Sequence, residues 1–335
     1  MIKVNTEKEK KKIALWLCLV FLLIICCGCG NKTEKIAHDG YEVIDSQGTT
    51  VKIPHKPMRI LTLSMYTDSI AMSMVTTDRM AAVYALSDDP VSSNIVEKAK
   101  KITTKVKMPS AEEVFAIKPD LIIANGWTSV EVIDSLRELG FPVVVCKSVA
   151  NLQDIKDCII LISKAVDEEE KGKLVLAKME EELAEITAKV AQIPPEKRQK
   201  VVLVSLMTSY GGSGCVFDDM CKYAGVINGI SAAGLKNGQT LTKEMLVSIN
   251  PDILLMSSYC DHGNYDVSKF NREYLEDPSL QTMKAIQNKK LLYPREGYIY
   301  NASQDFVYGV RELAYTVYGE EFAQAGNCHI SYSGE

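Results

Sequence analysis

The chain has 335 residues, of which 47% are hydrophobic and 24% are charged, and its formal net charge at pH 7 is −5. These values are typical of globular proteins and exclude a disordered composition, and the length allows two domains with separate cores. Residues 1–28 carry a net charge of +3, so the rest of the chain carries −8. A surface this acidic disfavours nucleic acid as a partner, because phosphate binding requires a basic patch.

The N-terminal segment has the order of a secretory signal peptide. The basic run KEKKK precedes fifteen apolar residues, IALWLCLVFLLIICC, which lead to Gly28 and Cys29. Fifteen residues are fewer than the roughly 20 that cross a bilayer as a helix. The order of basic, apolar and small residues is that of an export signal. We therefore expect the body of the protein to lie outside the cytoplasmic membrane.

The next region alternates β-rich runs with amphipathic stretches. RILTLS, DLIIA and FPVVVC lie in the first half, and KVVLVS, DILLMS and KKLLYP lie in the second. This alternation predicts a parallel sheet flanked by helices in each half. Between the halves, apolar residues spaced by three and four form one stripe from Leu176 to Ile193, and Pro194 ends it. The stripe predicts a helix of roughly 40 Å that holds both halves at a fixed separation.

The predicted fold is therefore α/β, with two Rossmann-like three-layer lobes, one long rigid helix that joins them and a ligand cleft between them. The expected segments are a signal peptide at 1–28, a tether and entry segment at 29–56, an N-terminal lobe at 57–166, a bridging helix at 167–194 and a C-terminal lobe at 195–335.

One phrase occurs twice in the chain. Residues 112–124 read EEVFAIKPDLIIA and residues 244–256 read EMLVSINPDILLM, 132 positions apart, and the same offset relates Trp127 to Tyr259. Ser110 and Glu113 have the spacing of a capping box, so each phrase reads as a capped helix followed by a buried strand. Ligands bind past the carboxyl ends of parallel strands. Two such edges facing each other would form a cleft with an aromatic residue on each wall.

These features together resemble the class III substrate-binding proteins of ABC importers for iron chelates, haem and cobalamin. The resemblance covers roughly residues 41–320 and includes DPSLQTMKAIQNKKLLYP near the end. It implies a lipid anchor on Cys29, although Cys26 stands where Leu is usual in a lipobox. It also implies that Glu112 and Glu244 contact a membrane permease. The alternative is that these first-turn carboxylates only interact favourably with the helix dipole. The implied partners are the permease with its ATPase, the membrane and a small metal chelate, and the chain is expected to be a monomer.

Candidate ligand-binding residues lie at the predicted edges of the cleft, most of them after strand ends and Met108 before the capped helix. They are Met65, Tyr66, Met108, Trp127, Tyr210, Tyr259, His262, Arg295, Tyr298 and Tyr300. His262 is the candidate metal ligand if the cargo is haem or an open iron chelate, because imidazole binds iron and cobalt. Arg295 could pair with a propionate or another anionic group. Ordinary alternatives remain for each type: a polar loop residue for His262, a solvated side chain for Arg295, and core packing for Met108 and some tyrosines.

Sequence motifs favour a binding protein over an enzyme. GGSGC is not the G-x-S-x-G nucleophile elbow, because Cys215 replaces the last glycine. The chain also lacks a zinc-protease motif and a phosphate-binding glycine loop. The sequence leaves open whether Cys215 and Cys221 form a disulfide. Ferric siderophores and haem are the leading ligands, cobalamin follows, and the alternative function is a surface sensor or metallochaperone without a transporter.

Overall fold

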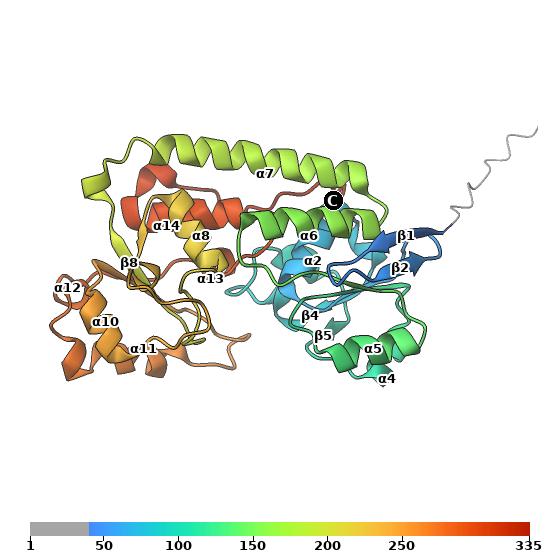
Figure 1. Ribbon diagram of the computed structural model, residues 1–335, viewed down its shortest axis with the longest axis horizontal. Helices are drawn as coiled ribbons and strands as arrows, with labels where there is room; N and C mark the ends of the chain where they lie inside the picture. Colours follow the sequence, from blue (N-terminus) through green and yellow to red (C-terminus); the bar gives the residue numbers. More distant parts are fainter. Residues whose placement is uncertain (1–39) are drawn as a thin grey trace, which may run out of the picture. The chain divides into compact units, whose positions relative to one another are not determined.

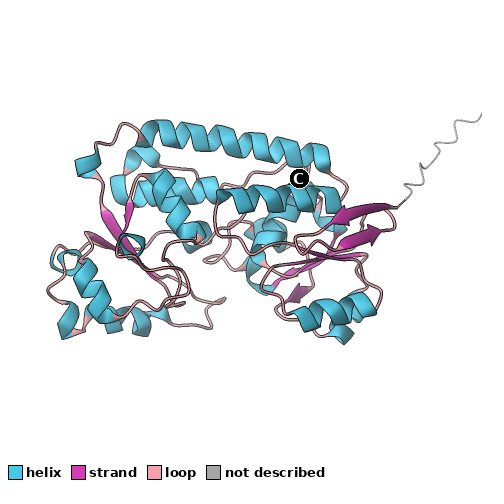
Figure 2. Ribbon diagram, viewed as in Figure 1, coloured by secondary structure: helices cyan, strands magenta, loops and turns pink. Residues whose placement is uncertain are grey.

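The computed structural model describes residues 40–335, so the predicted signal peptide and Cys29 lie outside the described residues. Within this range the chain forms one unit, in which two groups of strands are each covered by helices (Figure 1, Figure 2). The α/β prediction with two lobes is confirmed.

The N-terminal lobe contains a five-stranded parallel sheet in the order β5-β4-β3-β6-β7. This is the doubly wound arrangement, in which the strand order reverses between β3 and β6. Its elements are β3 (Ile60–Thr62), α2 (Met65–Met74), β4 (Met80–Tyr84), α3 (Val96–Ala99), β5 (Lys105–Val106), α4 (Ala111–Ile117), β6 (Leu121–Ala124), α5 (Val130–Glu138), β7 (Val143–Val145) and α6 (Leu152–Ala165), preceded by the antiparallel hairpin β1 (Tyr41–Ile44) and β2 (Thr50–Ile53).

The strands of this sheet are buried on both faces, which explains why they read as continuous apolar runs. In β6, Leu121 and Ile123 belong to the cluster that includes α2 and α6, whereas Ile122 and Ala124 pack with α4 and α5. Helices therefore cover both faces, and the lobe has three layers.

The C-terminal lobe repeats this plan with a four-stranded parallel sheet in the order β11-β10-β8-β9. Its strand order reverses between β8 and β10. Its elements are β8 (Lys200–Val204), α8 (Val216–Ala224), β9 (Ile227–Asn228), α9 (Gly229–Ala232), α10 (Lys243–Ile249), β10 (Ile253–Met256), α11 (Val267–Leu275), α12 (Lys284–Gln287), β11 (Leu291–Leu292), α13 (Glu296–Ile299) and α14 (Phe306–Tyr318), with short 3₁₀ turns at Pro195–Lys197, Pro278–Leu280 and Glu320–Phe322. The N-terminal lobe has two such turns, at Thr77–Arg79 and Ala85–Asp88.

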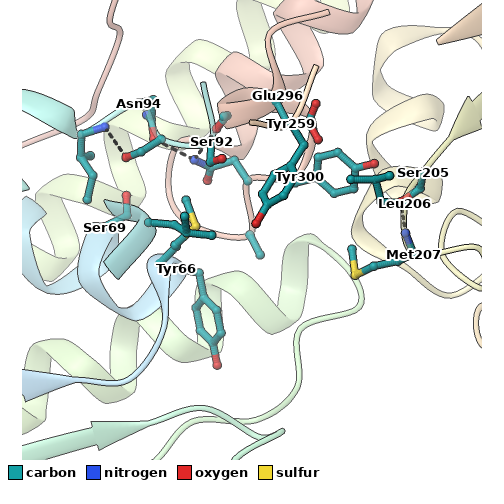
Figure 3. A pocket seen from close by; sticks show the side chains of 17 residues that line it. Tyr66, Ser69, Ser92, Asn94, Ser205, Leu206, Met207, Tyr259, Glu296 and Tyr300 are labelled. Carbon is teal, nitrogen blue, oxygen red and sulfur yellow. Dashed lines mark hydrogen bonds between the residues drawn. The ribbon is translucent and has the colours of Figure 1, made fainter. Parts of the chain in front are cut away.

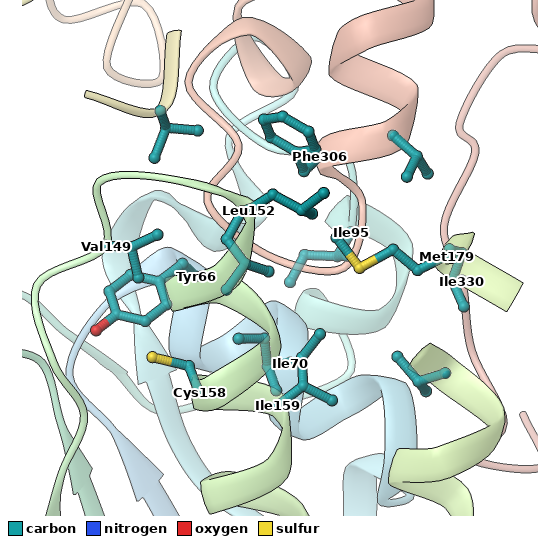
Figure 4. Packing of buried hydrophobic residues seen from close by; sticks show 14 of the residues in the cluster. Tyr66, Ile70, Ile95, Val149, Leu152, Cys158, Ile159, Met179, Phe306 and Ile330 are labelled. Atoms are coloured by element: carbon teal, nitrogen blue, oxygen red, sulfur yellow. The ribbon is translucent and has the colours of Figure 1, made fainter. Parts of the chain in front are cut away.

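The lobes are joined by helix α7 (Glu169–Val190), which runs alongside α6 of one lobe and α14 of the other (Figure 1). Met179 of α7, Leu152 of α6 and Phe306 of α14 belong to one continuous hydrophobic cluster (Figure 4). Because the two lobes share this core, a rotation between them would have to break close packing.

The repeated phrase has one structural role in both lobes. Asp120 accepts a hydrogen bond from the backbone N of Arg59 at 2.8 Å, and Asp252 accepts one from the backbone N of Lys200 at 2.9 Å. Each carboxylate thus holds the start of a neighbouring strand in place through a hydrogen bond to its backbone. The capping box is also present, since Ser110 N donates to Glu113 Oε2 at 2.7 Å and Glu113 N donates to Ser110 Oγ at 3.3 Å.

Two further findings concern the cysteines and the helices. Cys215 and Cys221 are both buried, and their thiols are free, so the open disulfide alternative does not hold. From residue 40 onward, no helix combines the length and the apolar character needed to span a membrane.

Candidate functional site: a cavity between the two lobes

The site begins where each sheet reverses its strand order. Met65 and Tyr66 open α2 directly after β3, and Ser64 caps this helix by accepting from Thr67 N. In the other lobe, Ser205 follows β8 and Tyr259 follows β10. These positions lie past the carboxyl ends of the strands beside the reversal, which is where open α/β sheets bind ligands.

A cavity of about 450 Å³ lies between the lobes at this place. The N-terminal lobe contributes Met65, Tyr66, Ser69, Leu86 and the loop 92–95. The C-terminal lobe contributes Ser205, Leu206, Met207, Tyr259, Glu296, Gly297, Tyr300, Asn301 and Ala302. Figure 3 shows Ser69 and Asn94 on one side and Tyr300, Ser205 and Met207 on the other. Cavities of this size and aromatic lining are typical of small-molecule sites.

The tyrosines of the cavity are held by packing. The Tyr66 hydroxyl donates to the Lys147 carbonyl at 3.1 Å, and burial raises the pKa of this phenol. Tyr300 stacks on Tyr210 with ring centroids 5.4 Å apart. The ring of Tyr259 packs against that of Tyr265, with their centroids 5.6 Å apart. The cavity therefore presents neutral aromatic rings that are preformed for contact with an organic ligand.

The floor of the cavity is a contact between the lobes. Gly297 N donates to the Val91 carbonyl at 3.0 Å, and a Cβ on Gly297 would lie 2.9 Å from the backbone carbon of Ser93. Only glycine allows this approach. Nearby, Asn301 Nδ2 donates to Asn94 Oδ1 at 3.0 Å.

Behind the floor, Asp305 is fully buried and joins three parts of the chain. Its Oδ2 accepts from Asn94 Nδ2 at 2.8 Å and from His329 Nδ1 at 2.6 Å, and its Oδ1 accepts from Ile330 N at 2.8 Å. Ser69 Oγ contacts both Ser303 Oγ at 3.0 Å and Asp305 Oδ2 at 3.4 Å. The C-terminal segment is thus tied to the walls of the cavity.

A second contact between the lobes involves His262. Its Nε2 lies 2.9 Å from Asp88 Oδ1, and its backbone N donates to Asp89 Oδ2 at 2.5 Å. The hydrogen bond with Asp88 raises the pKa of His262. The residue does not line the cavity, and it has a left-handed backbone with φ 54°. In residues 40–335, no group of three or more His, Cys, Asp or Glu side chains is arranged to hold a metal ion.

The structure brings four of the ten predicted ligand residues to the cavity, namely Met65, Tyr66, Tyr259 and Tyr300. Tyr210 lies behind Tyr300, and Tyr298 is buried in the core.

The other predicted residues lie elsewhere. Arg295 pairs with Glu312 at 2.7 Å. Met108 is 90% exposed. Trp127 is 66% exposed and contacts Tyr66 edge-on at 6.2 Å, so it adjoins a residue that lines the cavity.

Sequence reasoning missed several residues of the site. Ser205 to Met207 directly follow the run KVVLV, so the strand-end rule that selected Tyr259 would also have selected them. Ser69, Asn94 and Asn301 carry no comparable signal, because isolated polar residues of this kind occur throughout loops and helix termini.

Both predicted docking carboxylates are exposed near helix N-termini. Glu112 lies in the first turn of α4 and Glu244 in the first turn of α10. Phe115 is three residues beyond Glu112, on the same face of α4, and is 65% exposed. Exposed aromatic side chains of this kind are enriched at protein contact surfaces.

Comparisons with known proteins agree with this geometry. The family model described as periplasmic binding protein matches residues 62–296. An uncharacterised ABC transporter substrate-binding lipoprotein, YvrC, of Bacillus subtilis is 23% identical over 94% of this chain and 100% of its own. The Fe(3+)-citrate-binding protein YfmC of the same organism is 23% identical, and the match covers 89% of this chain and 91% of that protein. The apo structure of the periplasmic haem-binding protein RhuT from Roseiflexus sp. RS-1 shares the fold, with a TM-score of 0.67 and 20% identity over 79% of this chain and 99% of that one. The chain belongs to the periplasmic binding protein family, whose members bind ligands and are not enzymes.

Proposed function

We propose that this chain is the extracytoplasmic substrate-binding component of an ABC importer and that it captures an iron chelate, either a ferric siderophore or haem. The observation that carries the proposal is the cavity at both strand-order reversals, lined by residues of both lobes. Such a site encloses a ligand between two surfaces, as ligand pockets between domains commonly do. Similarity to an iron chelate-binding relative supports the ligand class.

Delivery to the permease would use Glu112 and Glu244. Both carboxylates are exposed in the first turns of corresponding helices, one in each lobe. A permease dimer with basic residues at matching positions would contact both lobes together, and a contact of this kind gains strength from two linked sites. Anchoring through a lipid on Cys29 and a monomeric state belong to the same proposal.

The ligand prediction can be tested by tryptophan fluorescence. Beyond residue 39, Trp127 is the only tryptophan, and it contacts Tyr66 on the cavity wall. Ferric siderophores and haem absorb at wavelengths that quench indole. Titration of residues 40–335 with ferric hydroxamates, ferric catecholates, ferric citrate, haem and cobalamin should give saturable quenching with one class of iron chelate.

The matched variant is Tyr300→Phe, which keeps the ring that lines the cavity but removes the hydroxyl that bonds with Ser205. Free tryptophan controls for inner-filter effects. Weaker binding by this variant would support the site. Saturable binding of cobalamin alone would favour the cobalamin alternative, and an absence of binding to every chelate would contradict the proposed function.

A further inference from the structure

The cavity has an unusual balance of charge for a site proposed to bind metal chelates. The side chains that line it are thioethers, phenols, hydroxyls, amides and aliphatic groups, together with one carboxylate, Glu296. Among the described residues, no Lys, Arg or His is part of the lining. A negatively charged ligand would therefore meet no cationic partner on the cavity wall.

Glu296 is held in place by neutral donors. Its side chain accepts from Ser257 Oγ at 3.0 Å, from Ser258 N at 2.7 Å and from Ser258 Oγ at 3.2 Å. The residue is only 8% exposed, and it has no ion-pair partner in the part of the chain that the structure describes. These neutral donors hold the carboxylate in place and supply no opposite charge.

The cationic side chains close in the sequence to the cavity residues are engaged by other partners. Lys98, three residues beyond Ile95, donates its Nζ to the Met72 carbonyl at 2.9 Å and to Ser331 Oγ at 2.6 Å. Arg295 precedes Glu296 but contacts Glu312 at 2.7 Å and stacks over the Tyr298 ring at 4.6 Å. Lys105 pairs with Asp88 at 3.2 Å. Each would have to give up these partners before it could reach a ligand.

Nearby carboxylates also raise the pKa of two tyrosines of the cavity. Burial, and after it the Glu296 carboxylate, raises the pKa of Tyr300. Burial, and after it Asp261, raises the pKa of Tyr259, and Asp89 contributes in the same direction. Negative charge therefore acts on the cavity from both its wall and its rim.

An anion that bound in this cavity would lose its hydration water, and the cavity wall would offer it no opposite charge. Burial of an unpaired charge is costly, and proximity to a second charge of the same sign adds to that cost. A neutral chelate avoids both penalties, and a cationic chelate gains an attraction to Glu296.

We propose that the cavity selects metal chelates that are neutral or positively charged and excludes those with a net negative charge. This inference rests on the proposed function, because it narrows the class of chelate that the importer carries. We therefore expect neutral and cationic ferric hydroxamates to bind more tightly than ferric citrate and than haem, whose propionates are anionic.

The test uses chelates that differ in charge at one point only. A linear ferric trihydroxamate with a free terminal amine is cationic, its N-acetyl derivative is neutral, and its N-succinyl derivative is anionic. Cyanocobalamin and its monocarboxylate form a second pair. Equilibrium dialysis against the full-length protein in mild detergent, with iron or cobalt counted on each side, gives each affinity.

The cationic form should bind on the order of tenfold more tightly than the anionic form. Glu296→Gln should reduce this preference to roughly threefold or less, whereas Ser257→Ala, which changes no charge, should preserve the order of affinities. Should Glu296→Gln fail to fold, Asp261→Asn removes a charge at the rim, and asparagine accepts the left-handed backbone of that position (φ 44°).

The outcomes separate this inference from the function on which it rests. An anionic form that binds as tightly as its cationic or neutral counterpart would overturn the charge selection and leave the importer function standing. A wild-type protein that binds none of these chelates, nor haem or ferric citrate, would overturn the proposed function and the selection together.

Discussion

Replacing Asp305 with asparagine should destabilise the protein strongly, because this residue is the centre of a buried polar network. Its carboxylate has no solvent exposure and accepts hydrogen bonds from both lobes and from the C-terminal segment. Asparagine has nearly the same shape but puts an amide NH₂ in place of one oxygen. That group would face the donors of Asn94 and His329 and could accept from neither.

The magnitude follows from these contacts. Loss of the short hydrogen bond from His329, at 2.6 Å, removes an interaction worth about 1.5–3 kcal/mol when a charged group takes part. The Asn94 amide keeps its bond to the Cys328 carbonyl, but the N–H that donates to Asp305 would lose its acceptor, which costs a further 1–3 kcal/mol or so. We therefore expect the free energy of unfolding to fall by about 3–5 kcal/mol, in agreement with the usual cost of removing one partner from a buried pair. For a chain of this length, the melting temperature should fall by roughly 4–7 °C.

Chemical denaturation and calorimetry measure this loss, with Asp134→Asn as the control at an exposed position of α5. Amide exchange at Ile330 gives a local measurement, since its N–H donates to Asp305 Oδ1. A double-mutant cycle with His329→Asn should show a coupling of more than about 1 kcal/mol. A loss of stability below about 1 kcal/mol, or single effects that simply add, would refute the view that Asp305 organises this network.

Two other predictions concern the permease contact and the second contact between the lobes. Replacing both Glu112 and Glu244 with alanine should abolish ligand-dependent stimulation of the partner ATPase and change ligand affinity by less than roughly threefold. The control Glu131→Ala, at another exposed first turn, should leave both the stimulation and the affinity unchanged. A collapse of ligand affinity would instead assign Glu112 and Glu244 to the cavity or the core. Because the hydrogen bond to Asp88 raises the pKa of His262, the stabilisation from this contact should be complete below the unfolded pKa of about 6.5 and should be lost as the pH rises through the folded value. Titration of the His262 ring by NMR should show its pKa falling toward the ordinary value in Asp88→Asn, and an unchanged pKa would contradict this cause.

Sequence patterns predicted the fold well because its signals are local. The stripe from Leu176 to Ile193 predicted the bridging helix, which the structure places at Glu169–Val190. The repeated phrase predicted a capped helix and a buried strand in each lobe, and both pairs are present. Each of these features depends on residues within about a dozen positions of one another, where propensity and periodicity act directly.

The candidate site was predictable only where it follows strand ends. Met65, Tyr66 and Tyr259 line the cavity because the chain must leave each strand at the edge where ligands bind. Asp305, by contrast, meets Asn94 over a separation of 211 residues. No periodicity or motif encodes such a pair, since it arises from the packing of one lobe against the other.

His262 and Arg295 show a related limit of sequence reasoning. Both residue types suit a ligand, and both follow strand ends as predicted. In the structure, His262 contacts Asp88 and Arg295 contacts Glu312. Whether a charged side chain is available to a ligand depends on which carboxylates the fold brings beside it, and each of these two contacts spans many residues.

The position of the cavity bears on how the protein works. The lobes already touch at its floor, where Gly297 approaches the backbone of Ser93, and at its rim, where His262 meets Asp89. They also share one hydrophobic core under α7 (Figure 4). A hinge that closed around the ligand would have to break and re-form these contacts in each binding cycle. Affinity in such a site depends on preorganised walls more than on domain closure. Selection among ligands then depends on the fixed chemistry of the walls, which gives the single carboxylate of Glu296 a larger influence than it would have in a site that rearranges.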